Sequence, residues 1–365
     1  RMVTVMVITC PHALGLAIPL VIAVITSISA KNGLLIRNRT AFENSRAVDV
    51  VVFDKTGTLT RGEFGVSETV SAGKWDASEI LRKAAALEKN SEHTIAKGIV
   101  AKAKEEKLKL PDTKNFEAVP GKGARGTVEG KQLFAGNKGI LEIAGTSLSE
   151  DLQKKADEYT GQGKTCIFVA EEKGVRGMIA LSDLIREESK EAIQRLQDEG
   201  ISVSMITGDN EATAEFAAGE LGLDSYFAEV LPDKKSEKIK ELQNKGKRVA
   251  MVGDGVNDAP ALAQADIGIA IGAGTDVAVE TADIVLIEND PRDILSILRL
   301  SKITQRKTLQ NLVWATGYNV IAIPLAAGVL YTYGIVLAPA VGALIMSLST
   351  VIVAVNAKLI SFEKE

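Results

Sequence analysis

The sequence is short of cysteine, of surplus basic charge and of an initiator methionine. Its two cysteines, Cys10 and Cys166, lie far apart, so there is no disulfide framework, and this usage suits a reducing cytosol. The formal net charge is -4, so bulk charge gives no reason to expect nucleic acid as a partner. The chain opens at Arg1 inside an apolar run, and we interpret it as a piece of a longer protein.

Apolar residues, by contrast, make up 46% of the chain and gather at its two ends. Residues 2–28 are uncharged and long enough to cross a bilayer core of about 30 Å as a helix. Pro11 and Pro19 are expected to break or bend that helix beside Cys10 and His12. A thiolate and an imidazole are soft ligands, suited to copper or zinc. Two alternatives stay open at this point: a signal peptide, and Cys10 as an ordinary core residue.

Basic residues between Lys31 and Arg46 follow this stretch and mark the cytoplasmic side of a membrane, which also argues against a cleaved signal. A second apolar region near the C-terminus consists of segments 312–330 and 335–357, joined by a short aromatic turn. Because its outer ends are basic, we predict a transmembrane hairpin over residues 308–358 with both ends cytoplasmic.

The chain is organised around the heptapeptide DKTGTLT, which begins at Asp54 and follows the valine-rich run 48–53. That run is typical of a buried strand in a parallel sheet. Ligands of open α/β sheets bind beyond the carboxyl ends of the strands, so Asp54 is placed to act as a nucleophile. Thr56, Gly57 and Thr58 offer hydroxyl and backbone N–H groups to phosphate oxygens. The alternative is an aspartate that merely caps a turn.

Two later strand ends carry similar small, polar and acidic motifs. Thr207-Gly208-Asp209 follows the predicted strand 203–206, and Gly253-Asp254-Gly255-Val256-Asn257-Asp258 follows the predicted strand 249–252. Strands that alternate with helices indicate a doubly wound parallel sheet, whose strand ends share one edge. The three motifs together indicate a phosphoryl-transfer site. For any one of them, ordinary turn chemistry is the alternative.

Between these motifs, residues 64–174 have a different pattern and predict an inserted domain. We expect helices over 77–88 and 94–107 and strands over 125–135 and 165–171. After the insert we expect a strand over 175–180 and a helix that opens at Ser182 and ends near Gly200. The glycine cluster that begins at Gly121 does not open a helix in a βαβ unit, so plain turns are an alternative explanation for it.

These motifs resemble those of the heavy-metal-transporting (CPx, type IB) P-type ATPases. DKTGTLT is the phosphorylation motif of that family, and Cys10-Pro11-His12 matches its intramembrane motif in the variant of the CopB-like copper-exporting branch. The resemblance implies a C-terminal fragment with a haloacid-dehalogenase-like α/β fold. The implied domains are a first transmembrane segment, a phosphorylation domain, an inserted α+β nucleotide-binding domain and a transmembrane hairpin, at residues 1–30, 31–63 with 175–298, 64–174 and 308–358.

The resemblance also implies functional residues. Those for phosphoryl transfer are Asp54, Lys55, Thr56, Thr207, Gly208, Asp209, Lys234, Asn257 and Asp258. Those for Mg²⁺ are Asp54, Thr56 and Asp254. Those for ATP are Glu88, His93, Gly121, Gly123, Gly136 and Asn137. Those for the transported metal are Cys10, His12, Tyr318, Asn319, Met346, Ser347, Ser349 and Thr350. The family usually has proline after the histidine of the ATP pocket, whereas this chain has Thr94.

The implied activity is ATP-driven translocation of a copper ion through an aspartyl phosphate at Asp54. The implied location is the plasma membrane, with several spans and with the catalytic domains in the cytoplasm. ATP, Mg²⁺, copper and the lipid bilayer are the implied partners, and nucleic acid is not. The actuator domain and the earlier spans of the family are missing, so we expect this fragment to bind nucleotide and accept phosphate but not to pump.

Three other functions stay open. A membrane-tethered phosphatase of the same superfamily would carry aspartate at the first and third motif positions, whereas Thr56 occupies the third. A nucleotide-sensing subunit without turnover would tolerate the loss of Asp54. The third is a P-type pump for another soft or borderline metal, such as silver or zinc. The sequence does not distinguish Cu(I) from Cu(II), nor does it give the transport direction or the oligomeric state.

Overall fold

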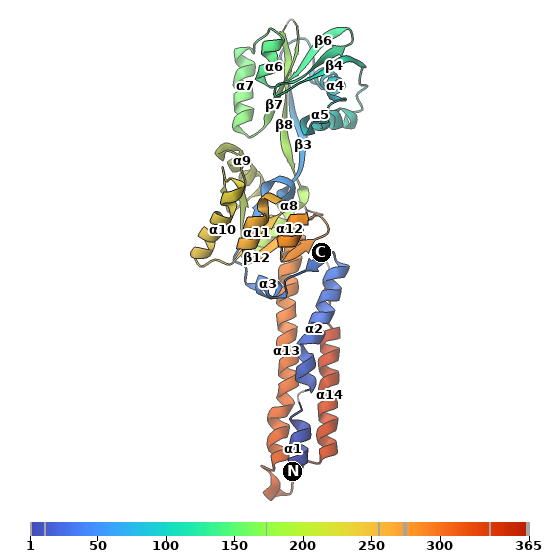
Figure 1. Ribbon diagram of the computed structural model, residues 1–365, viewed down its shortest axis with the longest axis vertical. Helices are drawn as coiled ribbons and strands as arrows, with labels where there is room; N and C mark the ends of the chain where they lie inside the picture. Colours follow the sequence, from blue (N-terminus) through green and yellow to red (C-terminus); the bar gives the residue numbers. More distant parts are fainter. Residues whose placement is uncertain are drawn as a thin grey trace. The chain divides into compact units, whose positions relative to one another are not determined.

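The computed structural model describes residues 2–10, 12–172, 174–254, 256–272, 276–335 and 337–362 (Figure 1). The chain divides into two compact units. The first consists of Arg1–Val51, Arg195–Ser202 and Ser236–Glu365, and the second of Val52–Gln194 and Val203–Lys235.

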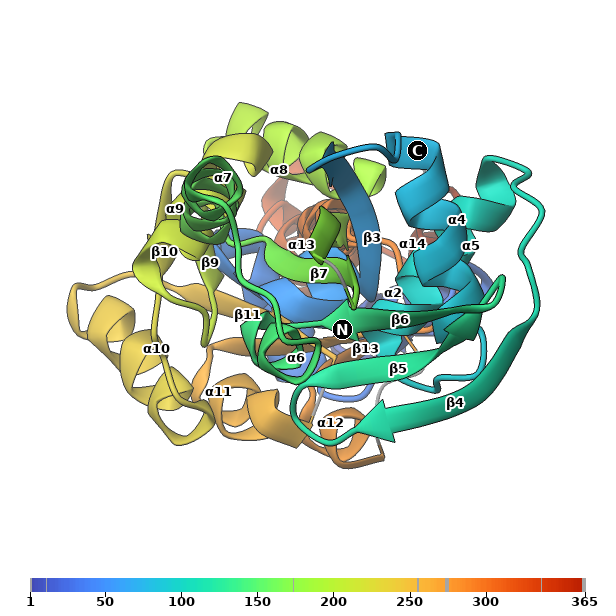
Figure 2. The same cartoon turned by 90° about the horizontal axis from the view of Figure 1, so that it is seen from above.

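The second unit contains a six-stranded antiparallel sheet, part of which faces the viewer in Figure 2. Its strands, in sheet order, are β3 (Thr60–Ser71), β8 (Gly174–Ile185), β7 (Thr165–Glu171), β6 (Lys131–Gly136), β5 (Gly123–Val128) and β4 (Thr113–Val119). Helices α4 (Ala77–Glu88), α5 (Thr94–Glu105), α6 (Lys138–Ile143) and α7 (Glu150–Gly161) connect these strands.

Helices cover both faces of this sheet, and the strand sequences account for it. Side chains alternate along a strand, so Ile167 and Val169 join one hydrophobic cluster while Phe168 joins another. The first cluster includes α4 and α5 residues, and the second includes α6 and α7 residues. On β7, the residues from Ile167 to Glu171 are therefore buried on both faces of the sheet.

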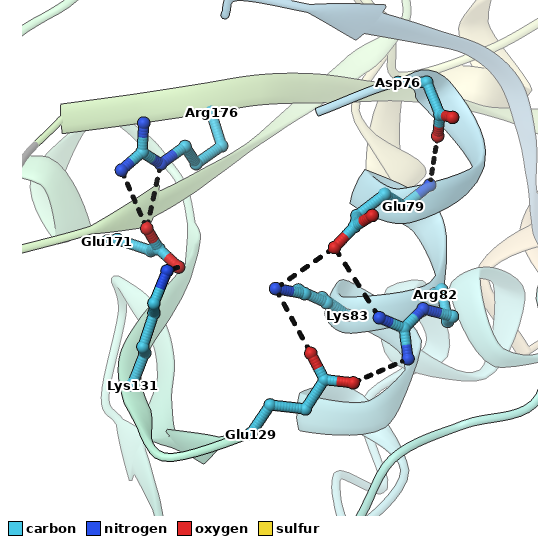
Figure 3. A network of polar contacts seen from close by, with 8 residues as sticks. All are labelled: Asp76, Glu79, Arg82, Lys83, Glu129, Lys131, Glu171 and Arg176. Carbon is cyan, nitrogen blue, oxygen red and sulfur yellow. Dashed lines mark hydrogen bonds and ion pairs between the residues drawn. The ribbon is translucent and has the colours of Figure 1, made fainter. Parts of the chain in front are cut away.

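An ion-pair network fixes the start of α4 to the turn between β5 and β6 (Figure 3). The Lys83 ammonium lies 3.2 Å from Glu79 and 3.3 Å from Glu129, and its side chain is 8% exposed. Arg82 donates a hydrogen bond of 2.9 Å to the same Glu129. Asp76 caps the helix by accepting from the Glu79 N–H. The network holds the helix whose last residue, Glu88, belongs to the site described below.

Two sequence predictions in this region were wrong. The predicted strand 125–135 is a hairpin of β5 and β6, turned by Glu129 and Gly130, both of which have positive φ. The helix predicted to open at Ser182 begins only at α8 (Glu187–Asp198), because β8 continues to Ile185 by pairing with β3. Tertiary pairing has overridden a local capping signal here.

The other sheet has seven strands and carries the predicted nucleophile. Its order is β1 (Leu34–Ile36), β13 (Ile284–Leu286), β12 (Ile267–Ile271), β11 (Val249–Gly253), β2 (Val50–Asp54), β9 (Ser202–Ile206) and β10 (Ser225–Phe227). The β9–β10, β11–β12 and β12–β13 pairs are parallel, as predicted, and the edge pair β1–β13 is antiparallel. Its connecting and flanking helices include α3 (Arg39–Asn44), α9 (Glu211–Leu221), α10 (Lys235–Asn244), α11 (Ala259–Gln264) and α12 (Asp276–Thr281).

The first unit also contains the apolar ends of the chain as helices α1 (Met2–Ile8), α2 (His12–Lys31), α13 (Asp293–Ala327) and α14 (Pro339–Lys358). The predicted break lies between Ile8 and His12, whereas Pro19 is accommodated within α2. Helices α2, α13 and α14 pack against one another (Figure 1). By length and composition, α2 and α14 could each cross a membrane. Helix α13 continues the predicted arm 312–330 back through the preceding basic segment.

Candidate functional site

Asp54 is the last residue of β2, and its side chain is 10% exposed. All five residues of this valine-rich strand are buried. The Lys235 ammonium lies 2.5 Å from an Asp54 carboxylate oxygen, and the Lys235 side chain is 8% exposed. A buried carboxylate needs a partner of this kind to remain charged. The pair thus holds a carboxylate at the strand end, where α/β sheets bind their ligands.

The turn Lys55–Leu59 follows directly. Gly57 has a φ of 78°, a left-handed conformation that glycine adopts without strain. Thr56 is exposed, whereas Thr58 is fully buried and its hydroxyl has no hydrogen-bond partner in the described structure. A buried hydroxyl without a partner is costly, and an oxygen of a bound anion would satisfy it.

The motif at the end of β9 lies in the same unit and meets this turn. The Lys55 ammonium lies 2.5 Å from an Asp209 carboxylate oxygen. The buried Thr207 hydroxyl donates to that carboxylate at 3.0 Å and accepts from the Asp209 N–H at 3.1 Å. Gly208 between them is exposed. The structure therefore brings four of the predicted residues of this unit, Lys55, Thr207, Gly208 and Asp209, to one place.

In the first unit, the motif after β11 gathers two carboxylates. Asp254 follows the strand, and Asp258 is buried with 1% of its surface exposed. Oxygen atoms of the two carboxylates lie within 4.8 Å of each other. A Cβ atom on Gly253 would lie 2.5 Å from an Asp258 oxygen, so this approach requires glycine. Asn257 is exposed beside them.

A separate cavity of about 450 Å³ lies in the second unit, against the six-stranded sheet. It is lined by every residue predicted for nucleotide binding, namely Glu88, His93, Gly121, Gly123, Gly136 and Asn137. Backbone and apolar atoms of β4, β5 and β7 complete the wall. A mostly apolar hollow with a few converging polar groups is the usual form of a small-molecule site.

Three of these residues shape the cavity wall. Gly123 and Gly136 face each other in the β5–β6 register, and a Cβ on either would lie 2.0 to 2.1 Å from a carbonyl oxygen. The Asn137 side chain donates to the Gly121 carbonyl at 2.8 Å and accepts from the Gly139 N–H at 2.9 Å. The Asn137 side chain thus caps α6 and also holds the Gly121 turn in position.

His93 caps α5, which begins at Thr94 without the proline usual in the family. Its Nδ1 atom accepts a hydrogen bond of 3.3 Å from the Ile95 N–H. A neutral imidazole that accepts at Nδ1 carries its proton on Nε2. His93 lines the cavity, and Nε2 is the ring nitrogen that this cap leaves for another partner.

Burial raises the pKa of Glu88 from 4.5 to about 7, partly opposed by a hydrogen bond with Ser91. Only 8% of Glu88 is exposed, and a desolvated carboxyl group favours its neutral form. The cavity thus holds an acid that changes charge near neutral pH.

This shift predicts a pH-dependent stability. The folded-state pKa is raised, so the stabilisation is fully present below the ordinary pKa of 4.5 and is lost as the pH rises through about 7. We expect a loss of up to about 3 kcal/mol across that window. Thermal unfolding at pH 5.5 and pH 8 should show a smaller decrease for Glu88→Gln than for the unmodified protein. Parallel pH profiles for the two proteins would contradict the shift.

The predicted membrane residues all lie in the first unit. Cys10 is half-buried at the break between α1 and α2, Pro11 lies outside the described residues, and His12 is exposed. The Tyr318 hydroxyl and the Asn319 side-chain oxygen are buried without a hydrogen-bond partner among the described residues. Tyr318 packs in the same cluster as Ile8, two residues before Cys10. These unpartnered oxygen atoms are available to a ligand.

The hydroxyl groups on α14 that were predicted to bind the transported metal donate hydrogen bonds to backbone carbonyl groups in this structure. Ser349 is buried and donates to the Trp314 carbonyl of α13 at 3.3 Å. Ser347 and Thr350 donate to carbonyl groups of their own helix at 3.0 and 3.1 Å, and Met346 is half-buried. Ser349 therefore acts as a helix–helix contact in this structure.

The sequence analysis missed several residues around Asp54. It named Lys234, but Lys234 is exposed, and the ammonium group against Asp54 is that of Lys235. Arg186 donates to the Gly57 and Thr60 carbonyl groups at 3.3 and 3.0 Å and so holds the turn after Asp54 in place. Two adjacent lysines after a proline could have signalled the ambiguity, whereas no local pattern marks Arg186.

A half-buried acid, Asp183, contacts the residue that follows the same turn. Asp183 accepts a hydrogen bond of 2.6 Å from Thr60. Burial raises the pKa of Asp183, and this contact with Thr60 opposes the rise. The sequence analysis had placed Asp183 at the start of a helix, so it gave no reason to connect it with Thr60.

Comparison with known proteins supplies the family. Residues 48–266 match the haloacid dehalogenase-like hydrolase family. The chain is 58% identical over 360 residues to copper-exporting P-type ATPase B of Archaeoglobus fulgidus, which covers 99% of this chain and 51% of that protein. The chain thus spans about half the length of the curated relatives it matches.

Solved structures agree with the fold. A zinc-transporting PIB-type ATPase in the E2.Pi state matches with a TM-score of 0.85 and 35% identity, over 96% of this chain and 56% of that one. The catalytic domain of a CPx-ATPase, CopB-B, matches with a TM-score of 0.57 and 30% identity, over 75% of this chain and 98% of that one. The second alignment covers nearly all of the solved domain.

Proposed function

Because the chain belongs to the heavy-metal-transporting P-type ATPases of the haloacid-dehalogenase-like superfamily, we propose that it is the phosphorylated part of an ATP-driven copper pump. The observation that carries the proposal is Asp54 itself. Its carboxylate is buried at the end of β2, is paired with Lys235, and is followed by a turn with an unpartnered buried hydroxyl on Thr58.

The proposed reaction begins when an Asp54 carboxylate oxygen attacks the γ-phosphorus of ATP. The bond from that phosphorus to the β,γ-bridging oxygen breaks, and ADP leaves with the electron pair. Water later splits the aspartyl phosphate into Asp54 and inorganic phosphate. The ammonium groups of Lys235 and Lys55 offset the negative charge of the incoming group, and the Thr58 hydroxyl donates to one of its oxygens.

The donor chemistry fits Mg²⁺, which prefers one or two carboxylates together with phosphate and water oxygen atoms. Asp54 and Asp254 are the ligands that we propose for it, as the family motifs imply. When bound, Mg²⁺ would offset charge on the transferred phosphoryl group. Thr56 remains a proposed residue of the Mg²⁺ site. Asn257 and Asp258 are proposed to orient these ligands.

We propose that the cavity beneath the six-stranded sheet binds the adenine and ribose of ATP. The side chains of His93 and Glu88 supply polar contacts. Gly121 supplies an open backbone position, since a Cβ there would meet no atom within 4 Å. Asn137 is proposed to act indirectly, by holding the Gly121 turn.

This assignment predicts a difference between two helix caps. Asn137→Ala should weaken ATP binding about tenfold, since it frees the Gly121 turn and removes the α6 cap. Ser149→Ala removes the equivalent cap of α7, where Ser149 accepts from the Leu152 N–H, and should leave ATP affinity nearly unchanged at a similar cost in stability. Isothermal titration of both variants measures this. Equal losses of affinity would mean that Asn137 has no special role.

The transported ion is proposed to be copper, bound by Cys10 and His12 with Tyr318, Asn319, Met346, Ser347, Ser349 and Thr350 around them. The thiol and thioether groups suit Cu(I), and the imidazole also accommodates Cu(II). The naming of the 58% identical relative supports copper, while the 35% identical solved pump is named for zinc. We place the phosphorylation and nucleotide sites on the cytoplasmic side of the plasma membrane.

The test is metal-dependent phosphorylation of the intact protein by ATP, compared across Cu(I), Cu(II), Ag(I) and Zn(II). We expect a copper ion to stimulate the phosphoenzyme most, and Cys10→Ser to abolish the stimulation. Stimulation by Zn(II) alone would mean that the transported ion is zinc and not copper. Turnover of small phosphoesters with no metal response would favour the phosphatase.

A further inference from the structure

A chain of polar side chains connects three helices of the first unit. The Lys307 ammonium of α13 donates to the Asn356 side-chain oxygen of α14 at 3.1 Å. The Asn356 amide donates to the Asn311 side-chain oxygen at 2.8 Å, and the Asn311 amide donates to the Ala17 carbonyl of α2 at 3.0 Å. Asn311 is completely buried. None of the functions above uses these residues.

The Asn311 amide bonds to α2 near a position where this helix lacks one of its backbone hydrogen bonds. Pro19 lies inside this helix and has no N–H, so the carbonyl group of Gly15 loses its helical donor. Pro19 is two residues from Ala17, whose carbonyl group receives the Asn311 amide. Side chains of neighbouring helices are the usual means by which a proline-interrupted membrane helix is stabilised. A buried amide is also costly unless its hydrogen bonds are made, so its presence needs a reason.

The helix packing between Ala17 and the start of α2 determines whether this hydrogen bond can affect the position of Cys10. Ala17 is five residues from His12, the first residue of α2, which is about 8 Å along the helix at 1.5 Å per residue, and Cys10 lies just before that start. Over that distance α2, α13 and α14 meet through a small apolar cluster that contains Ala13, Ala315 and Val353. Small side chains let helices approach closely but allow them to slide and rotate, since they form no directional bonds. The polar chain supplies the directional contact that the cluster lacks.

We propose that Lys307, Asn356 and Asn311 form a positioning clamp that fixes α2 against α13 and α14 at Ala17 and thereby fixes the Cys10–His12 segment. The clamp acts through α2 and does not touch the transported ion. Its significance for transport rests on the proposed function, in which Cys10 and His12 bind the metal. The placement of Cys10 itself can be tested without any metal.

The experiment measures the alkylation rate of Cys10 by N-ethylmaleimide in the intact protein, reconstituted in lipid nanodiscs, with labelled peptides identified by mass spectrometry. Asn311→Leu keeps the side-chain size and removes the bonds. It should change the Cys10 rate about tenfold, as expected for the loss of an interhelical hydrogen bond, and leave the Cys166 rate unchanged. Asn356→Leu leaves the Asn311–Ala17 bond possible and should act in the same direction. The double variant should go no further than Asn311→Leu.

Thr316→Val is the matched control, because the exposed Thr316 hydroxyl donates only to the Leu312 carbonyl of its own helix. Its Cys10 rate should equal that of the unmodified protein. Equal Cys10 rates in Asn311→Leu, Asn356→Leu and Thr316→Val would overturn the clamp. Metal activation of phosphorylation separates the two proposals. A changed Cys10 rate with unchanged metal activation would support the clamp and count against the metal role of Cys10.

Discussion

Replacing Asp54 with asparagine should abolish phosphoenzyme formation from ATP. The amide is nearly the same size as the carboxylate but has no nucleophilic oxygen, so the reaction loses its acceptor. We expect a decrease of about 10⁴-fold or more, as for the removal of other catalytic nucleophiles. The measurement is acid-quenched labelling with radioactive ATP. The label in the unmodified protein should survive acid and be released by hydroxylamine, as an acyl phosphate is.

Asp49→Asn is the control for this substitution. Asp49 lies just before the other end of β2 and accepts a hydrogen bond of 2.8 Å from the Arg248 N–H, which an asparagine oxygen can also accept. Labelling of Asp49→Asn should be close to normal, and both variants should bind ATP with normal affinity. Retained ATP turnover in Asp54→Asn would rule out the aspartyl phosphate, and full function without Asp54 would favour a nucleotide sensor.

Lys235→Met should lower the rate of phosphorylation about 100- to 1,000-fold, as expected for the loss of a preorganised charge at the reacting group. The Lys235 ammonium lies 2.5 Å from Asp54, and both side chains are buried. Methionine keeps most of the apolar stem and removes the charge. Single-turnover labelling at saturating ATP measures the effect on the chemical step.

Lys234→Met is the matched control, since Lys234 is the adjacent lysine and is exposed. We expect its labelling rate to stay within about threefold of normal, as for most surface substitutions. If the labelling rate falls further in Lys234→Met than in Lys235→Met, then Lys234, which the sequence motif suggested, is the lysine that supports phosphorylation.

Thermal unfolding separates catalysis from folding in this series. Lys235→Met removes the ammonium group that pairs with the buried Asp54 carboxylate, and breaking a buried ion pair typically costs about 3–5 kcal/mol. The double variant Asp54→Asn/Lys235→Met has no such charge and should be more stable than Lys235→Met. An additive decrease would mean that the two side chains are not coupled in solution.

Three strands of the sheet that carries Asp54, namely β2, β9 and β11, could be predicted from sequence because they are short, uninterrupted apolar runs. Such runs are buried on both faces, and their polar motifs then fall at the strand ends. The same reasoning failed at Ser182, where a capping residue lies in the middle of a long strand. The pairing of β8 with β3 decides the conformation there, and it joins residues more than 100 positions apart in the chain.

The candidate sites, too, were predictable from sequence only in part. The family motif predicted six residues that line one cavity of the second unit, but not what each side chain does there. That Gly123 and Gly136 exclude each other's Cβ atoms, and that Asn137 bonds the Gly121 turn, depends on strand register. Which of two adjacent lysines faces Asp54 depends on where α10 begins, and helix ends are the least predictable feature of a sequence.

The most direct test of the account is the position of the phosphate. The intact protein is phosphorylated with ATP and copper, quenched in acid and reduced with borohydride, which converts an aspartyl phosphate to homoserine and leaves free aspartate intact. Peptide mass spectrometry then locates the converted residue. The account predicts homoserine at position 54, dependent on copper and absent without ATP. Conversion at any other residue, or ATP turnover with position 54 unmodified, would contradict it.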